Sequence, residues 1–314
     1  MTGRIPIRVQ PMLATLVKEP FHRPGWVYEE KYDGYRILAY KEGSKVMLFS
    51  RNAKDRTAHF EPIADAVGAL RGETLLLDGE VVAFDRRGVS RFQLLQNVTD
   101  KVHYAVFDCL YVDGRDLRAQ PLQLRRAELE KILAKPVGKQ PILFVSARLA
   151  ADGLKAYEVA KQKGFEGVIA KDESSPYVEG RSTRWLKFKV KQEDEFIIIG
   201  YTAPAGAREH FGALLLAAHG GANDGDELTY VGKVGTGFSG EVLGRLFRKF
   251  QPLVRSKPPV ADPPRERDVT WLAPRLVAQI AYGEWTNDRK LRQPVFLGLR
   301  DDKRPEEVTL PEAK

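Results

Sequence analysis

The sequence contains a single cysteine, Cys109, among 314 residues. One cysteine excludes an internal disulfide bond and a zinc site with several cysteine ligands, and it favours a reducing, cytoplasmic environment. The sequence also lacks an apolar stretch near the roughly 20 residues that span a bilayer, and its polar start is unlike a signal peptide. Low-complexity tracts and fixed-period repeats are lacking too, which argues against solenoids and propellers. We therefore expect a cytoplasmic protein with no membrane segment.

Positive charge is in excess. The chain has 50 Lys and Arg against 42 Asp and Glu, which gives a formal net charge of +8 and a pI near 9.4. This excess suits a polyanionic partner such as nucleic acid, although many basic enzymes bind none. Charge alone therefore raises nucleic acid as a partner without identifying it.

The first part of the chain is rich in short β-type runs. We predict strands at residues 27–32, 37–41, 45–50, 74–84, 104–112, 142–146, 167–170 and 185–190. Helical periodicity predicts helices at residues 61–70, 122–133 and 153–163, the last with Asp152 as its N-cap and Gly164 as its C-terminal stop. Many strands with a few packed helices predict an α+β fold.

The charged segment 191–195 marks a change in the sequence. We place a domain boundary there, which gives domains at residues 1–190 and 191–314. In the second domain we predict one helix at residues 240–250 and strands at residues 196–201, 212–218, 228–234, 269–271 and 276–285. Five strands and one helix are typical of a small closed barrel of the OB type.

The sharpest local signal is the run Glu-Glu-Lys-Tyr-Asp-Gly-Tyr-Arg at residues 29–36. Asp-Gly is a common turn pair, so an isolated Lys-x-Asp-Gly is more often an ordinary hairpin. The functional alternative is a nucleophilic Lys31. Lysine has a pKa of about 10.4 and is protonated at neutral pH, so a nucleophile there requires nearby cations, a metal or desolvation.

Further motifs follow Lys31 in order along the chain. They contain, in this order, Arg51, Glu80, Phe107, Glu166, Lys187 and Lys189. The first four, taken singly, are equally well explained as loop, turn, core and strand-cap residues. The two lysines differ, because alternation along a strand puts both ammonium groups on one face and Phe188 on the other. Two like charges on one face favour an anionic partner such as a triphosphate.

In this order and spacing, the motifs resemble those of the covalent nucleotidyltransferase superfamily of DNA ligases, RNA ligases and mRNA capping enzymes. The run Pro-Val-Phe-Leu-Gly-Leu-Arg-Asp-Asp-Lys at residues 294–303 resembles the C-terminal motif of ATP-dependent DNA ligases. Together with residues 200–202, 210–214 and 230–238, it is similar especially to the ligase module of bacterial ligase D, the end-joining ligase. The resemblance implies a nucleotidyltransferase (adenylation) domain with antiparallel sheets and flanking helices, followed by an OB domain.

The resemblance also implies a reaction. Lys31 would attack the α-phosphate of ATP and carry AMP, which would pass to the 5′-phosphate of broken DNA before the 3′-hydroxyl seals the strand. Glu29 would read the adenine edge, and Phe107 would stack on the base. The ribose and neighbouring phosphates would be held by Arg36, Arg51 and Glu80.

By the same resemblance, Glu166 with Glu80 would bind Mg²⁺ or Mn²⁺, since hard carboxylate oxygens suit these ions. Lys187 and Lys189 would contact the α-phosphate and stabilise charge in the transition state. From the OB domain, Arg300 and Lys303 would swing over the nucleotide to orient pyrophosphate. The hinge would lie at residues 191–195.

The chain departs from larger relatives in size. It carries neither the extra DNA-binding domain of large ligases nor the polymerase and nuclease modules of many ligase D chains. We expect a monomer that grips nicked or broken double-stranded DNA with two domains, or that works with the end-binding protein Ku or with such modules. The short stretch before Lys31 favours ATP over NAD.

Two alternatives stay open. The first is an RNA ligase or a capping guanylyltransferase, which would keep the nucleophile but use another acceptor or nucleotide. The second is a non-catalytic DNA-binding module in which Lys31 only contacts phosphate, and whose DNA binding would depend strongly on salt.

Overall fold

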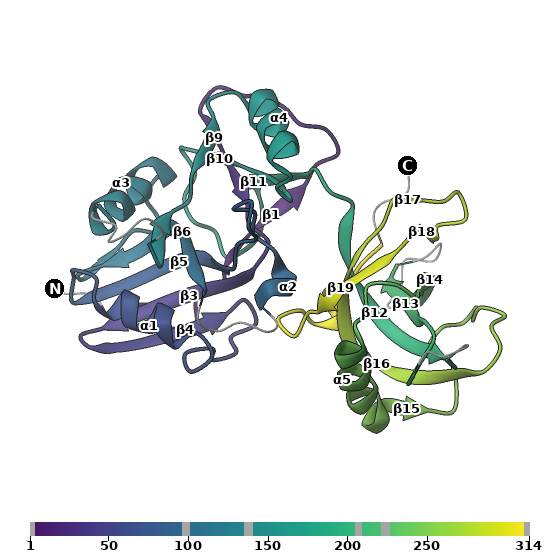
Figure 1. Cartoon of the computed structure of the whole chain (residues 1–314). Coiled ribbons are helices and arrows are strands. Elements are labelled where there is room, and N and C mark those ends of the chain that lie inside the picture. Colours follow the sequence, from purple (N-terminus) through teal and green to yellow (C-terminus); the bar gives the residue numbers. More distant parts are fainter. Residues whose placement is uncertain (1–3, 96–100, 135–140, 205–208, 221–226, 311–314) are drawn as a thin grey trace. The chain divides into compact units, whose positions relative to one another are not determined.

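The structure is a computed structural model that describes residues 4–95, 101–134, 141–204, 209–220 and 227–310. The chain forms two compact units, Met1–Lys191 and Gln192–Lys314 (Figure 1). Both units contain several strands and few helices, which confirms the predicted α+β class. Within the described segments, no helix combines the length and the apolar character needed to cross a bilayer.

The first unit contains two β-sheets. In the first sheet the strand order is β1-β11-β10-β2-β9, and all neighbours are antiparallel except β1 and β11. Its strands are β1 (Met12–Leu16), β2 (Trp26–Lys31), β9 (Arg148–Ala150), β10 (Gly167–Asp172) and β11 (Gly180–Lys189). The helix α4 (Gly153–Lys163) packs against β2, β9 and β10 and lies on the outer side of this sheet (Figure 1).

The second sheet has the order β4-β3-β5-β6-β7, with β8 added in parallel to β6. Its strands are β3 (Tyr35–Glu42), β4 (Lys45–Ser50), β5 (Thr74–Val82), β6 (His103–Val112), β7 (Arg115–Asp116) and β8 (Leu143–Val145). The helices of this part are α1 (Glu61–Gly68), the one-turn α2 (Phe92–Leu95) and α3 (Leu122–Ile132). Helix α1 packs on β3 and β4, and α3 packs on β6.

Buried side chains join the two sheets face to face. Leu76 and Phe107 of the second sheet share an apolar cluster with Trp185 of the first. The outer face of the first sheet packs against Ala156 and Ala160 of α4. The unit is therefore layered as helix, sheet, sheet and helix, and the inner faces of its sheets meet.

Helix α4 shows how local sequence sets an element. It runs over the predicted residues, and the Asp152 side chain accepts hydrogen bonds from the backbone N–H groups of Leu154 and Lys155. Gly164 ends the helix in the left-handed conformation, with φ of 72°. Both predicted caps are confirmed. The helices predicted at 61–70 and 122–133 end slightly earlier than expected, at Gly68 and Ile132.

The second unit has the OB-type fold that the sequence predicts. Its main sheet has the order β14-β13-β12-β16-β15, and β19 pairs with β16. Its strands are β12 (Glu193–Thr202), β13 (Leu214–His219), β14 (Leu228–Val234), β15 (Val254–Arg255), β16 (Val269–Ala281) and β19 (Val295–Leu299). The strands β17 (Glu284–Trp285) and β18 (Leu291–Arg292) form a separate hairpin, and two short 3₁₀ turns occur at Gln251–Leu253 and Pro305–Glu307. Helix α5 (Gly240–Phe250) starts at Ser239, whose hydroxyl caps the N–H of Val242.

One strand prediction in this unit is wrong. We predicted separate strands at residues 269–271 and 276–285, but β16 runs unbroken through Pro274. Its register with β12 shifts at this point, from the Leu276 pair to the Trp271 pair. Proline has no N–H to donate to the ladder, so it is tolerated at such an irregularity. Pro274 therefore coincides with the shift in register and does not end the strand.

Glu30 is a buried charge-bearing residue on the outer face of the first sheet. Alternation turns it away from Glu29 and Lys31, so that its side chain is on the same face as Tyr28 and the α4 core. It is 9% exposed, and within the described structure its Oε1 atom has no hydrogen-bond partner. Burial raises the pKa of Glu30 to about 8, although Lys163 and Lys191 partly offset this. Folding therefore favours the protonated carboxyl.

The free energy of unfolding should consequently fall as pH rises, and Glu30→Gln should abolish the part of this fall that comes from Glu30. Folding raises the pKa from 4.5 to about 8, so the contribution of Glu30 is complete below pH 4.5 and is lost as pH rises through 8. Between pH 4.5 and 8, the free energy of unfolding of Glu30→Gln should therefore rise relative to that of wild type. Each unit of pKa shift corresponds to about 1.4 kcal/mol. Urea unfolding at pH 5, 7 and 9 measures this difference. Glu158→Gln, on the exposed face of α4, is the control, and a difference between wild type and Glu30→Gln that stays constant with pH would contradict the interpretation.

Candidate active site

The inner face of the first sheet collects charged side chains from three strands. Antiparallel pairing aligns Lys31 with Gly167 and Lys189, and Glu29 with Ile169 and Lys187. Residues aligned in this way point to the same face of a sheet. Phe188 lies on the opposite face, buried with α4. The predicted alternation is therefore confirmed, and Glu29 and Lys31 share a face with both lysines.

Lys31 and Glu166 form an ion pair at the end of β2. The Lys31 Nζ atom contacts the Glu166 Oε1 atom, and the two side chains are 18% and 8% exposed. Glu166 immediately precedes β10, and its backbone carbonyl accepts a hydrogen bond from the N–H of Val190 at 2.9 Å. The structure thus brings together two of the predicted site residues, one from each end of the first domain.

The turn after Lys31 is fixed by its own residues. The Asp33 carboxylate accepts a 3.0 Å hydrogen bond from the N–H of Phe92, and the Asp33 N–H donates to the Ser90 hydroxyl at 3.0 Å. A Cβ atom at Gly34 would lie 2.1 Å from the Val81 carbonyl oxygen, so no side chain fits there. The Lys-x-Asp-Gly pattern therefore has a structural role in holding the end of β2 against the second sheet.

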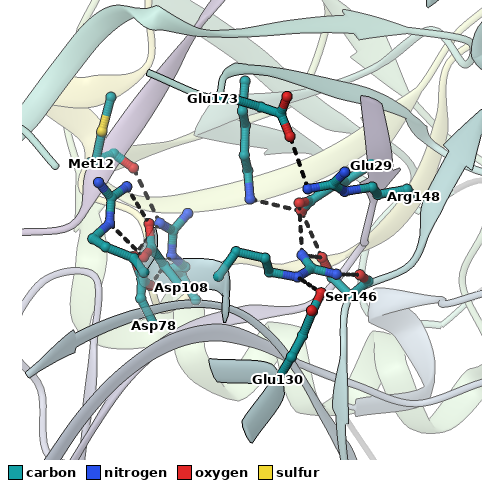
Figure 2. Close-up of polar contacts among 12 residues, drawn as sticks. Met12, Glu29, Asp78, Asp108, Glu130, Ser146, Arg148 and Glu173 are labelled. Atoms are coloured by element: carbon teal, nitrogen blue, oxygen red, sulfur yellow. Dashed lines mark hydrogen bonds and ion pairs between the residues drawn. The ribbon is translucent and has the colours of Figure 1, made fainter. Parts of the chain in front are cut away.

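Arg36 is anchored in the second sheet. Its guanidinium donates to both Asp78 oxygens, at 2.5 and 2.7 Å, and to the Met12 carbonyl at 3.2 Å (Figure 2). Tyr177 donates to the same carboxylate at 2.6 Å. Burial alone would lower the pKa of Arg36, but Asp78 outweighs it and the pKa is raised. Arg36 is thus a fixed cation at this site.

The Glu29 carboxylate receives three donors. Arg126 donates to Oε1 at 2.9 Å, while the Ser146 hydroxyl and the Lys171 ammonium donate to Oε2 at 2.6 and 2.7 Å (Figure 2). Glu29 is 3% exposed. Burial alone would raise its pKa, but Lys171 and Arg126 reverse this effect and hold the pKa below its ordinary value. Glu29 is therefore a buried, ionised hydrogen-bond acceptor.

Two aromatic rings lie beside these cations. The Phe107 and Trp185 rings are edge to face, with centroids 6.0 Å apart. The Lys171 Nζ atom lies 4.4 Å from each centroid, and the Arg36 guanidinium carbon lies 4.4 Å from the Phe107 centroid. Burial lowers the pKa of Lys171 even though Glu29 opposes the shift. Phe107 is thus both a core residue and a wall of the charged region.

Two more predicted residues lie in the second sheet. Glu80 on β5 is the register partner of Arg36 on β3. Arg51 directly follows β4 and is partly exposed. Glu80 therefore lies on a central strand and Arg51 just beyond the edge strand β4, and the roles predicted for both stay predictions.

The predicted metal ligands are compatible with a magnesium-type site. Among the residues that the structure describes, no group of three or more His, Cys, Asp or Glu could by itself hold a metal ion. Mg²⁺ usually takes one or two carboxylates and completes its shell with water and substrate phosphates. Glu166 and Glu80 would supply two carboxylates, and the remaining ligands would come from water and a nucleotide.

Arg300 and Lys303 belong to the second unit and are held there by carboxylates. Arg300 is 8% exposed and forms a fork with Asp302 at 2.9 and 2.8 Å, and it also donates to the Gln279 side chain at 3.0 Å. Lys303 lies 3.5 Å from Glu195. Their predicted role toward the nucleotide stays a prediction.

Sequence reasoning missed Arg126 and Lys171 as parts of the site. Arg126 stands with Leu122, Arg125 and Leu129 at spacings of three and four residues, the core-facing stripe of a helix. An arginine in such a stripe signals a buried partner. Arg125 is the second instance, since it forms a fork of two 2.8 Å bonds with Asp108 and both side chains are fully buried.

Comparisons with known proteins agree along the chain. The family described as the ATP dependent DNA ligase domain matches residues 11–189, and the ATP dependent DNA ligase C terminal region matches residues 207–303. The chain is 38% identical over 313 residues to the multifunctional non-homologous end joining protein LigD of Pseudomonas aeruginosa. It is 32% identical over 328 residues to a DNA ligase of Thermococcus onnurineus.

These alignments cover the chain more fully than they cover the relatives. They span 97% and 96% of this chain, but 37% of the Pseudomonas protein and 57% of the Thermococcus protein. A solved structure of mycobacterial DNA ligase D complexed with ATP and MES is 34% identical, with a TM-score of 0.71. That match covers 96% of this chain and 98% of the other. The chain is thus similar over its length to one part of larger relatives.

Asp78→Asn should destabilise the first unit strongly. It would leave the Arg36 guanidinium, 17% exposed, without its carboxylate partner, and breaking a buried pair in this way costs about 3–5 kcal/mol. Glu128→Gln is the matched control, because its partners Arg115 and Lys131 are 59% and 71% exposed and such pairs contribute about 0–1 kcal/mol. Urea unfolding of both variants measures the difference. Equal losses in the two variants would show that Arg36 does not depend on Asp78.

Proposed function

The chain belongs to the ATP-dependent DNA ligase family, and we propose that it seals broken DNA strands through AMP carried on Lys31. The observation that supports this most directly is the ion pair of Lys31 with Glu166, on a sheet face shared with Glu29, Lys187 and Lys189. Such a face offers a nucleophile, an acceptor for a base and cations for phosphates. Residues 1–190 would form the nucleotidyltransferase domain and residues 191–314 the OB domain.

In the first step, the Lys31 amine attacks the α-phosphorus of ATP. A P–N bond forms, the P–O bond to pyrophosphate breaks, and the lysine gives up a proton. The Glu166 carboxylate contacts the Lys31 ammonium and is placed to receive that proton or to help hold a cation. A divalent metal, held by Glu166 and Glu80 together with phosphate oxygens, would neutralise the charge of the triphosphate.

Lys187 and Lys189 would bind the α-phosphate. Their register puts them beside Ile169 and Gly167, in line with Glu29 and Lys31 respectively. Fixed cations aimed at developing negative charge lower the barrier to phosphoryl chemistry, because they need no reorganisation during the reaction.

The base would lie between Glu29 and Phe107. Glu29 accepts hydrogen bonds and would read the adenine edge, and a base stacked on Phe107 would compete with Arg36 and Lys171 for the ring face. We propose that Arg36, Arg51 and Glu80 hold the ribose and the adjacent phosphates. Arg36 could do so only through N–H groups that Asp78 does not occupy.

The later steps use the same lysyl adenylate. AMP passes to the 5′-phosphate at a break, which regenerates the Lys31 amine and makes a good leaving group. The adjacent 3′-hydroxyl then attacks that phosphate and expels AMP, which leaves a phosphodiester bond. Arg300 and Lys303 would act in the first step by orienting pyrophosphate. Both contact Glu195, which lies in the segment 191–195 that we propose as the hinge.

The name of the Pseudomonas relative suggests a setting for this activity. We propose that the protein acts inside the cell in the joining of broken double-stranded DNA, as a monomer, with Ku and with end-joining polymerase or nuclease modules as partners. The positive net charge suits the DNA itself. An RNA ligase or capping enzyme, and a DNA-binding module without catalysis, stay as alternatives that the following experiment separates.

The test is covalent labelling with α-labelled ATP or GTP and a divalent metal, followed by denaturing electrophoresis and a nick-sealing assay. Wild type should take up label from ATP and seal nicks, and Lys31→Ala should lose both, because the attacking amine is gone. Lys45→Ala, at the exposed start of β4, should keep both. Label from GTP would favour capping, label without sealing of DNA would favour RNA, and the absence of label would leave a binding module.

A further inference from the structure

Arg126 is a buried charged residue, and removing its guanidinium from water costs free energy that an apolar side chain would not cost. It is 7% exposed on the core-facing stripe of α3, which it shares with the apolar Leu122 and Leu129. Buried ion pairs can often be replaced by hydrophobic residues with no loss of stability. A buried arginine at this position therefore points to a requirement other than packing.

Four groups fix the orientation of the Arg126 guanidinium. One terminal nitrogen donates to Glu29 and to the Ser146 hydroxyl, the other donates to the Ser146 carbonyl, and Nε donates to Glu130 at 3.0 Å (Figure 2). Glu130 is 57% exposed at its side chain, whereas Glu29 and Ser146 are buried. The Arg126 guanidinium thus links the exposed Glu130 on α3 to the buried Glu29 carboxylate on β2.

We propose that Arg126 is a specificity-determining positioning residue, which holds Glu29 as an ionised acceptor so that the site selects the 6-amino group of adenine and rejects the 6-oxo group of guanine. The inference rests on the proposed function, in which Glu29 reads the base. Arg126 itself touches Glu29 and not the nucleotide.

The chemistry of the two purines makes the protonation state of Glu29 decisive. An ionised carboxylate only accepts hydrogen bonds, whereas a protonated carboxyl can also donate one. Adenine carries an amino donor at its 6-position and guanine carries an acceptor oxygen. An ionised Glu29 therefore matches adenine and opposes guanine, while a protonated Glu29 could bind either. Arg126 and Lys171 are the two cations that keep the proton away from Glu29.

The contacts also indicate which oxygen meets the base. Each carboxylate oxygen has two lone pairs, and Ser146 and Lys171 together engage both on Oε2. Arg126 engages one on Oε1, which leaves the second lone pair of that oxygen for an amino hydrogen of the base. Arg126 thus orients the oxygen that would make the selective contact.

The test compares lysyl-nucleotide formation from ATP, GTP and purine riboside triphosphate, which lacks a 6-substituent, in wild type and Arg126→Met. In wild type, loss of the amino group should lower kcat/KM by roughly 10- to 100-fold, since the acceptor is charged and buried. In Arg126→Met, the kcat/KM ratio of ATP to GTP should fall at least about tenfold. The kcat/KM ratio of ATP to the purine analogue should fall by a smaller factor, because a protonated carboxyl still accepts a hydrogen bond from the amino group but is no longer charged. A merely structural loss would lower all three rates by one factor and leave both ratios unchanged.

Two further variants keep the test decisive. Glu128→Gln, on the same helix but paired with the exposed Arg115 and Lys131, should leave both ratios as in wild type. Arg126→Lys keeps the charge and should recover part of the ATP preference. If Arg126→Met does not fold, Ser146→Ala, which removes an uncharged donor to Glu29, should show an intermediate fall in both ratios.

The outcomes separate the inference from the function on which it rests. Wild type that takes no label from ATP, or label that persists in Lys31→Ala, would overturn both. ATP-specific labelling on Lys31, with ratios that do not change in Arg126→Met or in Ser146→Ala, would overturn the role of Arg126 alone.

Discussion

The register between β10 and its neighbours β2 and β11 decides which side chains enter the site. Glu29, Lys31, Lys187 and Lys189 face inward because each is aligned with a residue of β10. A slip of one residue in any of these strands would turn its side chains to the other face. The apolar outer face prevents this, since Tyr28, Val168 and Phe188 pack under α4. An ordinary hydrophobic core therefore holds a charged surface in place.

Buried charge in the first unit is organised as separate, matched groups. Asp78 holds Arg36, Asp108 holds Arg125, and Glu29 holds both Arg126 and Lys171. Taking such groups out of water is costly, and close multiple hydrogen bonds are what compensate it. The consequence is a set of side chains whose orientation is fixed before any ligand arrives. Fixed dipoles and charges of this kind are the main means by which enzymes stabilise the charge of phosphoryl transfer.

Local signals were readable in the sequence, and long-range partners were not. The caps Asp152 and Gly164 and the alternation at Lys187 and Lys189 are properties of neighbouring residues, and the structure confirms them. Strand β1 was not predicted because its five residues, Met-Leu-Ala-Thr-Leu, include one β-branched residue and no aromatic one. The donors of Glu29 were missed for a different reason, since Arg126 and Lys171 lie 97 and 142 positions away from it. Periodicity predicts that a residue is buried, but it does not identify the residues that contact it.

A crystal structure of the protein after incubation with ATP and Mg²⁺ would show directly whether Lys31 carries AMP. We expect continuous electron density from the Lys31 Nζ atom to the phosphorus of AMP, with the 6-amino group of adenine at Glu29 Oε1. AMP bound without a bond to Lys31, or with its base away from Glu29, would contradict this expectation.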